Sequence, residues 1–418
     1  MINKLYSFIY RLTLTILFLY IFYYLFFNSY EFFFLVFIYI FSSLTFVWFN
    51  MILLAISDYP NKKKSPDWNK PFTLVIPVRD ENPDRFRQVL DAVVRSDGEK
   101  EIIIGDDGSK KEYTNQYIKI LRNLKREGYN IKFYKFKTSG KRIVQVKLHK
   151  IASYDIIINL DSDVIVWQKT FVRLLSPFYD EKVGISNARI DVRFGNRAVD
   201  MYYNALYICA NQNGRKGMGK IGLMPCASGE LLAYRKEILD KDIDKYENAK
   251  YLWRIPVSYG EDRLLTNIIL SKGYSSVYCE DSLGWTWGKE SLTNLVKQQL
   301  RWRRSWIRES IRCLSFSYKR PLLFFNTLLS VILPISFSIL IVSSIIRIIA
   351  VQDYTSLMLL PLIVIITTII KDLPLIIEES QVSFVFKIMI FATTNLIFIT
   401  PLWILAVITV DSQNWETR

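Results

Sequence analysis

The residues best suited to chemistry lie in two stretches, residues 260–263 and 298–306. The first places the carboxylate of Asp262 two positions after a glycine. The second falls in an expected helix with two tryptophans and five arginines, namely Arg301, Arg303, Arg304, Arg308 and Arg312. A carboxylate beside a cationic, aromatic surface suits a reaction in which a hydroxyl loses a proton while a diphosphate leaves, with an indole supporting an apolar or sugar-like acceptor. The alternative is a solvated basic helix whose tryptophans anchor it at a membrane surface.

Two acidic pairs follow expected strands, Asp106 with Asp107 after residues 101–105 and Asp161 with Asp163 after residues 155–160. The carboxyl ends of parallel strands share one edge of a sheet, so both pairs are expected there. Asp161 and Asp163 would reach one hard cation, Mg²⁺ or Mn²⁺, although an aspartate-rich turn is the alternative. Asp106 or Asp107 would accept a hydrogen bond from a uracil imide or a ribose hydroxyl.

A glycine and two cations open the expected helix 141–152, in the order Gly140, Lys141, Arg142. This arrangement favours a phosphate cradle, with an exposed basic helix start as the alternative. The chain has one histidine, His149, which is expected to be structural, so acid–base chemistry falls to carboxylates. The cysteines lack metal-ligand spacing and are predicted to be reduced thiols: Cys209, Cys226, Cys279 and Cys313.

The region 66–290 has the pattern of a cytosolic α/β domain. Apolar strands are expected at residues 72–78, 101–105 and 155–160, and residues 131–137 alternate like a strand. Strands of this kind that alternate with helices predict a mostly parallel sheet covered on both faces.

Long apolar runs flank this domain. Residues 5–27 and 32–56 are each long enough to cross a bilayer, which takes about 20 residues, and the distribution of Lys and Arg places their outer ends in the cytosol. Residues 322–350 and 354–370 predict two more spans, and residues 384–410 a third stretch that lies along the interface or folds back near Pro401. The net charge of +15 then indicates anionic lipid and phosphate ligands rather than nucleic acid, because the basic residues border apolar spans.

An ordered set of motifs runs through most of the chain, from residue 71 to the terminus. It comprises residues 140–142, 161–163, 195–197, 226–229, 234–237, 260–267, 297–310 and 415–418. Together they resemble the membrane-bound processive glycosyltransferases of the second glycosyltransferase family, and most closely the bacterial hyaluronan synthases.

The resemblance implies an A-type nucleotide-sugar domain at the cytosolic face of the plasma membrane, inserted between transmembrane helices. Two N-terminal spans (1–57) would precede the domain. A basic interfacial helix (291–320) and C-terminal membrane or interfacial helices (321–418) would follow it. UDP-sugars, a growing polysaccharide and the lipid bilayer are the implied partners, and the oligomeric state is left open.

The resemblance also implies roles for individual residues. Asp262 would be the base that deprotonates the acceptor hydroxyl for an inverting displacement. The donor would be held by Asp106, Asp107, Lys141, Arg142, Asp161, Gln298 and Arg301, the metal by Asp161 and Asp163, and the acceptor by Trp302, Ser228 and Gly229. Trp415 and Arg418 would form an element that closes over bound nucleotide.

Three residues depart from the hyaluronan synthase pattern. Glu261 stands in place of the usual Asp, Glu230 in place of Pro and Glu416 in place of Gly. Glu230 borders the expected acceptor pocket, so the sugar identity stays open. Another extracellular polysaccharide, a single transfer to a lipid carrier, and a non-enzymatic lipid-binding or transport role remain as alternatives.

Overall fold

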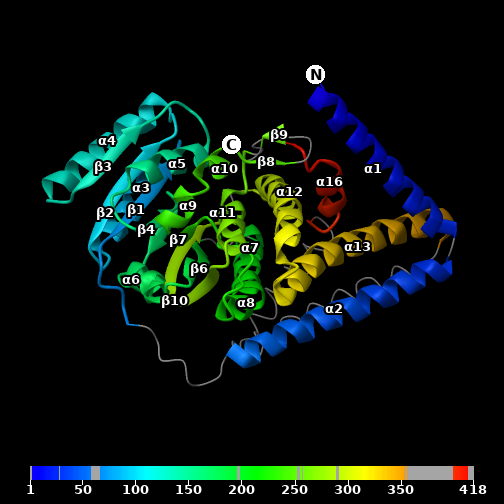
Figure 1. Ribbon diagram of the computed structural model, residues 1–418. Helices are drawn as coiled ribbons and strands as arrows, with labels where there is room; N and C mark the ends of the chain where they lie inside the picture. Colours follow the sequence, from blue (N-terminus) through cyan, green and yellow to red (C-terminus); the bar gives the residue numbers. More distant parts are fainter. Residues whose placement is uncertain are drawn as a thin grey trace.

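The computed structural model describes residues 2–27, 29–57, 66–194, 198–251, 255–256, 258–288, 291–352, 354 and 399–412. A sheet-containing domain occupies one side of the molecule in Figure 1. The long helices α1 (Ile2–Phe27), α2 (Ser29–Ser57) and α13 (Pro321–Val351) extend away from it on the other side.

The central sheet has eight strands in the order β3-β2-β1-β4-β7-β6-β10-β5. All pairings are parallel except those of β7 with β4 and β6 and that of β5 with β10. The mostly parallel sheet predicted from the sequence is therefore confirmed. The bounds are β1 Phe72–Val78, β2 Lys100–Asp106, β3 Ile131–Lys135, β4 Ile156–Leu160, β5 Val164–Val166, β6 Val183–Phe194, β7 Leu231–Arg235 and β10 Ser275–Trp287.

Both faces of the sheet are buried, which explains why its strands read as continuous apolar runs. In β1, Leu74 and Ile76 belong to one hydrophobic cluster and Val75 to the other. Helices α3 (Pro83–Arg95), α4 (Lys111–Arg126), α6 (Thr170–Leu175) and α7 (Ala198–Cys209) supply the first cluster. Helices α5 (Lys141–Ile151), α9 (Lys236–Asp240), α10 (Ile243–Glu247) and α11 (Glu261–Ser271) supply the second.

Shorter elements complete the domain. They are a 3₁₀ turn at Ser176–Tyr179, a π-helical turn at Ala210–Lys216, α8 (Gly217–Lys220) and a small hairpin of β8 (Lys250–Tyr251) and β9 (Ile255–Pro256).

His149 is buried on α5, where its ring nitrogens contact the Tyr234 hydroxyl at 3.1 Å and Asp240 at 2.7 Å. The structural role predicted for this histidine agrees with these contacts.

Helix α12 (Leu292–Ser317) connects the domain to the long helices. Its N-cap, Ser291, accepts a hydrogen bond from the Asn294 backbone N–H at 3.2 Å. It packs against α11 on the domain side and against α13 and α16 (Leu402–Ile408) on the other. In Figure 1 it stands between the sheet domain and the long helices.

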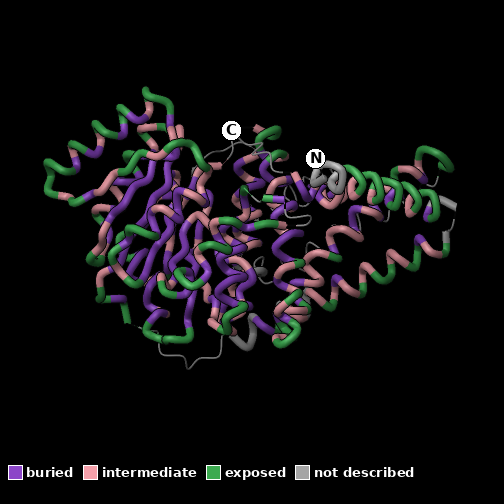
Figure 2. Tube along the Cα trace, turned by 45° about the horizontal axis from the view of Figure 1, so that its top comes forward, coloured by how far each residue is buried: buried purple, intermediate pink, exposed green. Residues whose placement is uncertain are grey.

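The apolar helices fit the predicted flanking spans by length and composition. Within the described residues, α1 (window Phe8–Leu25) and α13 are long and apolar enough to cross a membrane, and α2 has a shorter apolar stretch, Tyr30–Phe46. Figure 2 shows exposed residues along much of α1. Most of the predicted span 354–370 and residues 384–398 lie outside the described residues, and α16 begins directly after Pro401.

Candidate active site

A cavity of about 780 Å³ lies where the domain meets α12. It brings together eleven of the predicted site residues: Asp107, Lys141, Arg142, Asp161, Asp163, Ser228, Gly229, Asp262, Gln298, Arg301 and Trp302. Asp106 does not line it, and Trp415 and Arg418 lie outside the described residues.

The carboxylate of Asp262 is oriented by two backbone N–H groups. It lies in the first turn of α11, where Oδ1 accepts from the Arg263 N–H at 2.8 Å and Oδ2 accepts from the Gly229 N–H at 3.2 Å. A Cβ atom at Gly229 would lie 3.3 Å from the Asp262 Cβ and 3.4 Å from the Lys141 Nζ. The glycine therefore allows the loop 226–230 to approach both side chains.

Two adjacent acids on α11 have different protonation behaviour. Burial and the neighbouring Glu261 charge raise the pKa of Asp262 to about 6. Burial also raises the pKa of Glu261, but the Lys141 ammonium, 3.4 Å away, outweighs it and leaves that pKa below its ordinary value. A general base needs a pKa near the working pH, so Asp262 is the better proton acceptor.

Lys141 is the central cation of the cavity. Its Nζ lies 2.5 Å from Asp161 Oδ1 and 3.4 Å from Glu261 Oε1. Burial lowers its pKa, but the attraction of Asp161 and Glu261 outweighs this effect and raises the pKa above its ordinary value, so the ammonium stays protonated. The sequence predicts a phosphate contact for Lys141. In the structure, its ammonium group also neutralises the two acids near Asp262, which are Asp161 and Glu261.

Asp161 and Asp163 offer a donor set that fits a divalent cation. Burial raises the pKa of Asp161, Lys141 counters this effect, and the Asp163 carboxylate raises the pKa again. Within the described ranges no group of three or more His, Cys, Asp or Glu residues is arranged to hold a metal ion. Two hard oxygen ligands match Mg²⁺ or Mn²⁺, which bind through one or two carboxylates and take other ligands from phosphates and water.

The two aspartates after β2 have different positions. Asp106 is fully buried, and its oxygens accept from the Ser109 N–H and the Thr114 hydroxyl, both at 2.8 Å. Asp107 lines the cavity and accepts from the N–H groups of Ser139 at 2.7 Å and Gly140 at 3.1 Å. A donor contact is therefore predicted for Asp107, and the contacts of Asp106 are structural.

The arginines of α12, which the sequence suggested as one cationic surface, have different positions in the structure. Of the five arginines on this fully described helix, only Arg301 lines the cavity. Arg304 and Arg308 are buried and donate to the segment around Val410, Arg303 donates to Gln299, and Arg312 pairs with Glu309. The alternative of a solvated basic helix is therefore wrong for the middle of α12, because these guanidinium groups have protein partners.

Several cavity residues were not singled out as site residues from the sequence: Arg79, Arg215, Tyr259, Arg263, Ser305 and Trp306. Arg263 stacks 3.6 Å above the Trp306 ring and donates to the Trp306 carbonyl at 2.9 Å. Two tyrosines of α7 both pack in the core and line the cavity. Tyr203 and Tyr207 are buried and line the cavity, where their hydroxyls donate to Gln298 and Glu230.

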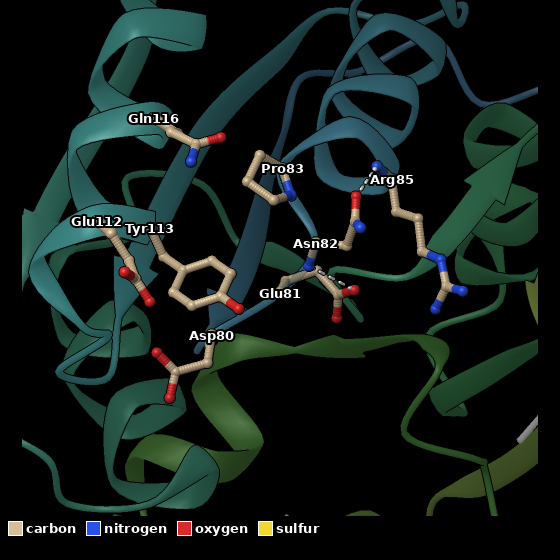
Figure 3. Close-up of a pocket in the computed structure, with 8 residues that line it drawn as sticks. All are labelled: Asp80, Glu81, Asn82, Pro83, Arg85, Glu112, Tyr113 and Gln116. Atoms are coloured by element: carbon tan, nitrogen blue, oxygen red, sulfur yellow. Dashed lines mark hydrogen bonds between the residues drawn. The ribbon is translucent and has the colours of Figure 1, made fainter. Parts of the chain in front are cut away.

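A second, more open pocket of about 470 Å³ lies beside the first and shares Glu81 with it. Its lining includes the carboxylates of Asp80, Glu81 and Glu112 with a single cation, Arg85 (Figure 3). With one cation for three carboxylates this pocket disfavours an anionic ligand, whereas the larger cavity has several cations beside its acids, Lys141 and Arg301 among them.

Gly260 has the backbone conformation that the start of α11 requires. Its φ is +88°, and a Cβ there would overlap the Ser305 hydroxyl. We expect Gly260→Ala to lower the free energy of unfolding by more than the roughly 1–2 kcal/mol of a left-handed non-glycine residue. The control is Gly128→Ala, where φ is +97° but nothing lies within 4 Å. Thermal unfolding of the purified variants should show the larger loss for Gly260→Ala, and equal losses would contradict the overlap with Ser305.

The fold and the cavity define the class of protein. A mostly parallel sheet carries carboxylates and cations at the carboxyl ends of its strands, and the Asp262 carboxyl group, whose pKa is raised to about 6, lines the same cavity. This combination suits a reaction in which a hydroxyl loses a proton while an anionic group leaves. The sequence profile of glycosyl transferase family 2 matches residues 73–242. Residues 73–242 therefore carry a glycosyl transferase family 2 domain, which indicates that the protein is a glycosyltransferase, and relatives at about 26% identity connect it to the hyaluronan synthases.

Known proteins of two kinds resemble the chain. The hyaluronan synthase of Streptococcus pyogenes is 26% identical over 383 residues, which cover 86% of this chain and 85% of that protein. N-acetylglucosaminyltransferases of Bradyrhizobium diazoefficiens and Sinorhizobium fredii are 26% and 27% identical over 57% and 58% of this chain. These matches span 49% and 58% of the two transferases, about half of their length.

Among solved structures, a mannosyltransferase from Pyrobaculum calidifontis in complex with GDP-mannose and Mn²⁺ has the same fold. Its TM-score is 0.60 at 15% sequence identity, over 87% of this chain and 97% of that one. This similarity confirms the α/β fold class predicted from the sequence.

Proposed function

We propose that the protein is a membrane-bound, processive, inverting glycosyltransferase that polymerises sugars from UDP-sugars into a β-linked polysaccharide and passes it across the membrane. Hyaluronan, made from UDP-N-acetylglucosamine and UDP-glucuronate, is the favoured product, because the hyaluronan synthase match covers most of both chains. The observation that carries the proposal is the single cavity that unites Asp262, Asp161, Lys141, Arg301 and Trp302.

The proposed reaction is one in-line displacement. The acceptor hydroxyl gives its proton to Asp262 as its oxygen bonds to the anomeric carbon of the donor, and the bond from that carbon to the diphosphate oxygen breaks. Lys141 and Arg301 hold the negative charge that develops on the departing UDP. Glu261 is paired with Lys141, so Asp262 acts without a second acid as nucleophile, and the configuration inverts.

Asp161 and Asp163 are proposed to hold Mg²⁺ or Mn²⁺ together with the donor diphosphate. When bound, such a cation supplies charge neutralisation for the leaving group. The fit of the two carboxylates supports this proposal, as does the Mn²⁺ in the complex of the mannosyltransferase with the same fold.

The aromatic wall supports a polymer acceptor. Tyr203, Tyr207, Trp302 and Trp306 line the same cavity, and the Trp306 indole N–H donates to Ser330 of α13 at 3.2 Å. The acceptor end of the cavity is thus adjacent to a helix that is long and apolar enough to span a bilayer. A chain that grows at Asp262 would leave along this path.

Glu230 favours a second candidate product. Its carboxylate lies in the cavity wall and accepts from the Tyr207 hydroxyl. A uronate placed against it would meet a like charge, so a polymer of neutral sugars or N-acetylhexosamines fits this part of the wall better.

A donor assay tests the function. We expect UDP release by the purified enzyme only when UDP-glucuronate and UDP-N-acetylglucosamine are both present, with a large product that hyaluronidase degrades. UDP release with a different donor pair would exclude hyaluronan and keep the class. Transfer of one sugar to a lipid carrier would contradict processive synthesis.

A further inference from the structure

An ion pair joins the two ends of the described chain. Arg11 of α1 donates through Nε to Asp411 Oδ1 at 2.9 Å, and its Nη2 lies 2.8 Å from the same oxygen. The Asp411 side chain is only 2% exposed, whereas that of Arg11 is 42% exposed. A carboxylate so deeply buried requires a partner, because an unpaired buried charge is costly. In Figure 1, α16 lies between α1 and α12. Asp411 lies in the turn that follows α16.

The backbone on either side of Asp411 is hydrogen-bonded to α12 and to the sheet-containing domain. Arg308 donates to the Val410 carbonyl at 3.0 Å, and the Tyr259 hydroxyl donates to the Ser412 carbonyl at 2.9 Å. Arg308 also donates to the Tyr259 carbonyl at 3.1 Å and lies 4.3 Å from the centre of its ring. Arg308 and Tyr259 are both buried.

These contacts lead to Asp262, the proposed catalytic base. Tyr259 immediately precedes Gly260, which starts α11, and Asp262 lies in the first turn of that helix. The Gly260 conformation leaves little freedom here, because the residue is packed against Ser305 of α12. A shift of the turn at 410–412 would therefore move Tyr259 and change the direction of the Asp262 carboxylate.

We propose that Arg11 and Asp411 are positioning residues for catalysis. Their ion pair fixes the C-terminal turn against the first helix, and the turn fixes Tyr259 and Arg308, which set the position of Asp262. The inference goes beyond the proposed function, since it applies to whichever sugar is transferred.

Charge exchange across the pair tests the inference. Asp411→Asn and Arg11→Met are each expected to lower kcat by about 10–100-fold, the size of effect that a remote misplacement of reacting groups produces. Binding of UDP, measured by calorimetry, should stay within about threefold of wild type, because the donor contacts predicted for Asp107, Lys141 and Arg301 in the cavity wall are unchanged. The double variant Arg11→Asp with Asp411→Arg restores an ion pair and should recover most of the lost kcat.

Two further variants separate positioning from stability. Tyr259→Phe keeps the ring against Arg308 and removes only the hydroxyl that reaches Ser412, so it should lower kcat while the protein keeps its thermal unfolding temperature. Lys169→Met breaks a comparable but exposed pair with Asp67, 3.2 Å apart, and should leave kcat unchanged.

The inference is wrong if the single variants turn over as wild type does. It is equally wrong if the folded charge-exchange variant is no more active than the single variants and Tyr259→Phe has wild-type kcat. Should a single variant fail to fold, the charge-exchange and Tyr259→Phe results decide.

Discussion

Replacing Asp262 by asparagine is expected to lower kcat by about 10²–10⁴-fold, the range that general acid–base catalysis contributes. The amide has nearly the same shape as the carboxylate and keeps an oxygen that can accept from the Arg263 N–H, but it cannot take the acceptor proton. Donor binding should change little, since Lys141 and Arg301 remain in place. Single-turnover transfer and UDP affinity, measured on the same preparation, separate the two effects.

The pH profile of the wild-type enzyme gives an independent check. The pKa of Asp262 is raised to about 6, so the base is protonated and inactive below that pH and ionised above it. Activity should rise through pH 6 and level off above it, and below pH 6 it should fall by about tenfold per pH unit. Asp244→Asn removes an exposed acid on α10 and should leave the profile unchanged. A wild-type rate for Asp262→Asn, or a profile that is flat around pH 6, would remove Asp262 as the base.

The architecture of the domain was predictable because its strands carry a strong local signal. Residues such as Leu74, Val75 and Ile76 are apolar in succession because both faces of β1 are covered. The edge position of Asp161 follows from the same rule, since it directly follows β4. The antiparallel β7 was not predicted, because its direction depends on how the chain returns to the sheet and not on its own residues.

The positions of the acids and of the cations at the site were each predictable only in part. Asp107 and Asp106 look alike in the sequence, and only the buried Ser109 and Thr114 contacts distinguish their roles. The arginines of α12 also look alike, although Arg308 is bonded to a carbonyl more than a hundred residues away. Such differences arise from contacts between distant segments, on which periodicity and motif spacing give no information.

Removing the charge of Lys141 is the second change with a large expected effect. Lys141→Met should lower kcat by about 10²–10³-fold, the loss seen when one stabilising donor is removed from a reacting charge. It should also move the acid limb of the pH profile. The ammonium lowers the pKa of Asp262, so its removal raises that pKa and shifts the limb to higher pH. The pKa of Lys141 is raised above its ordinary value, so its own titration does not enter this range.

The two effects of Lys141 are separable by experiment. Lys147→Met removes a cation from the same helix, where the ammonium lies 4.8 Å from the Phe136 ring and outside the cavity lining, and should change neither kcat nor the limb. If Lys141→Met loses rate but its acid limb stays near pH 6, then Lys141 stabilises the leaving group and does not affect the pKa of Asp262. A shifted limb would show that Lys141, which pairs with Asp161 and Glu261 on the donor side, also sets the basicity of the residue that activates the acceptor.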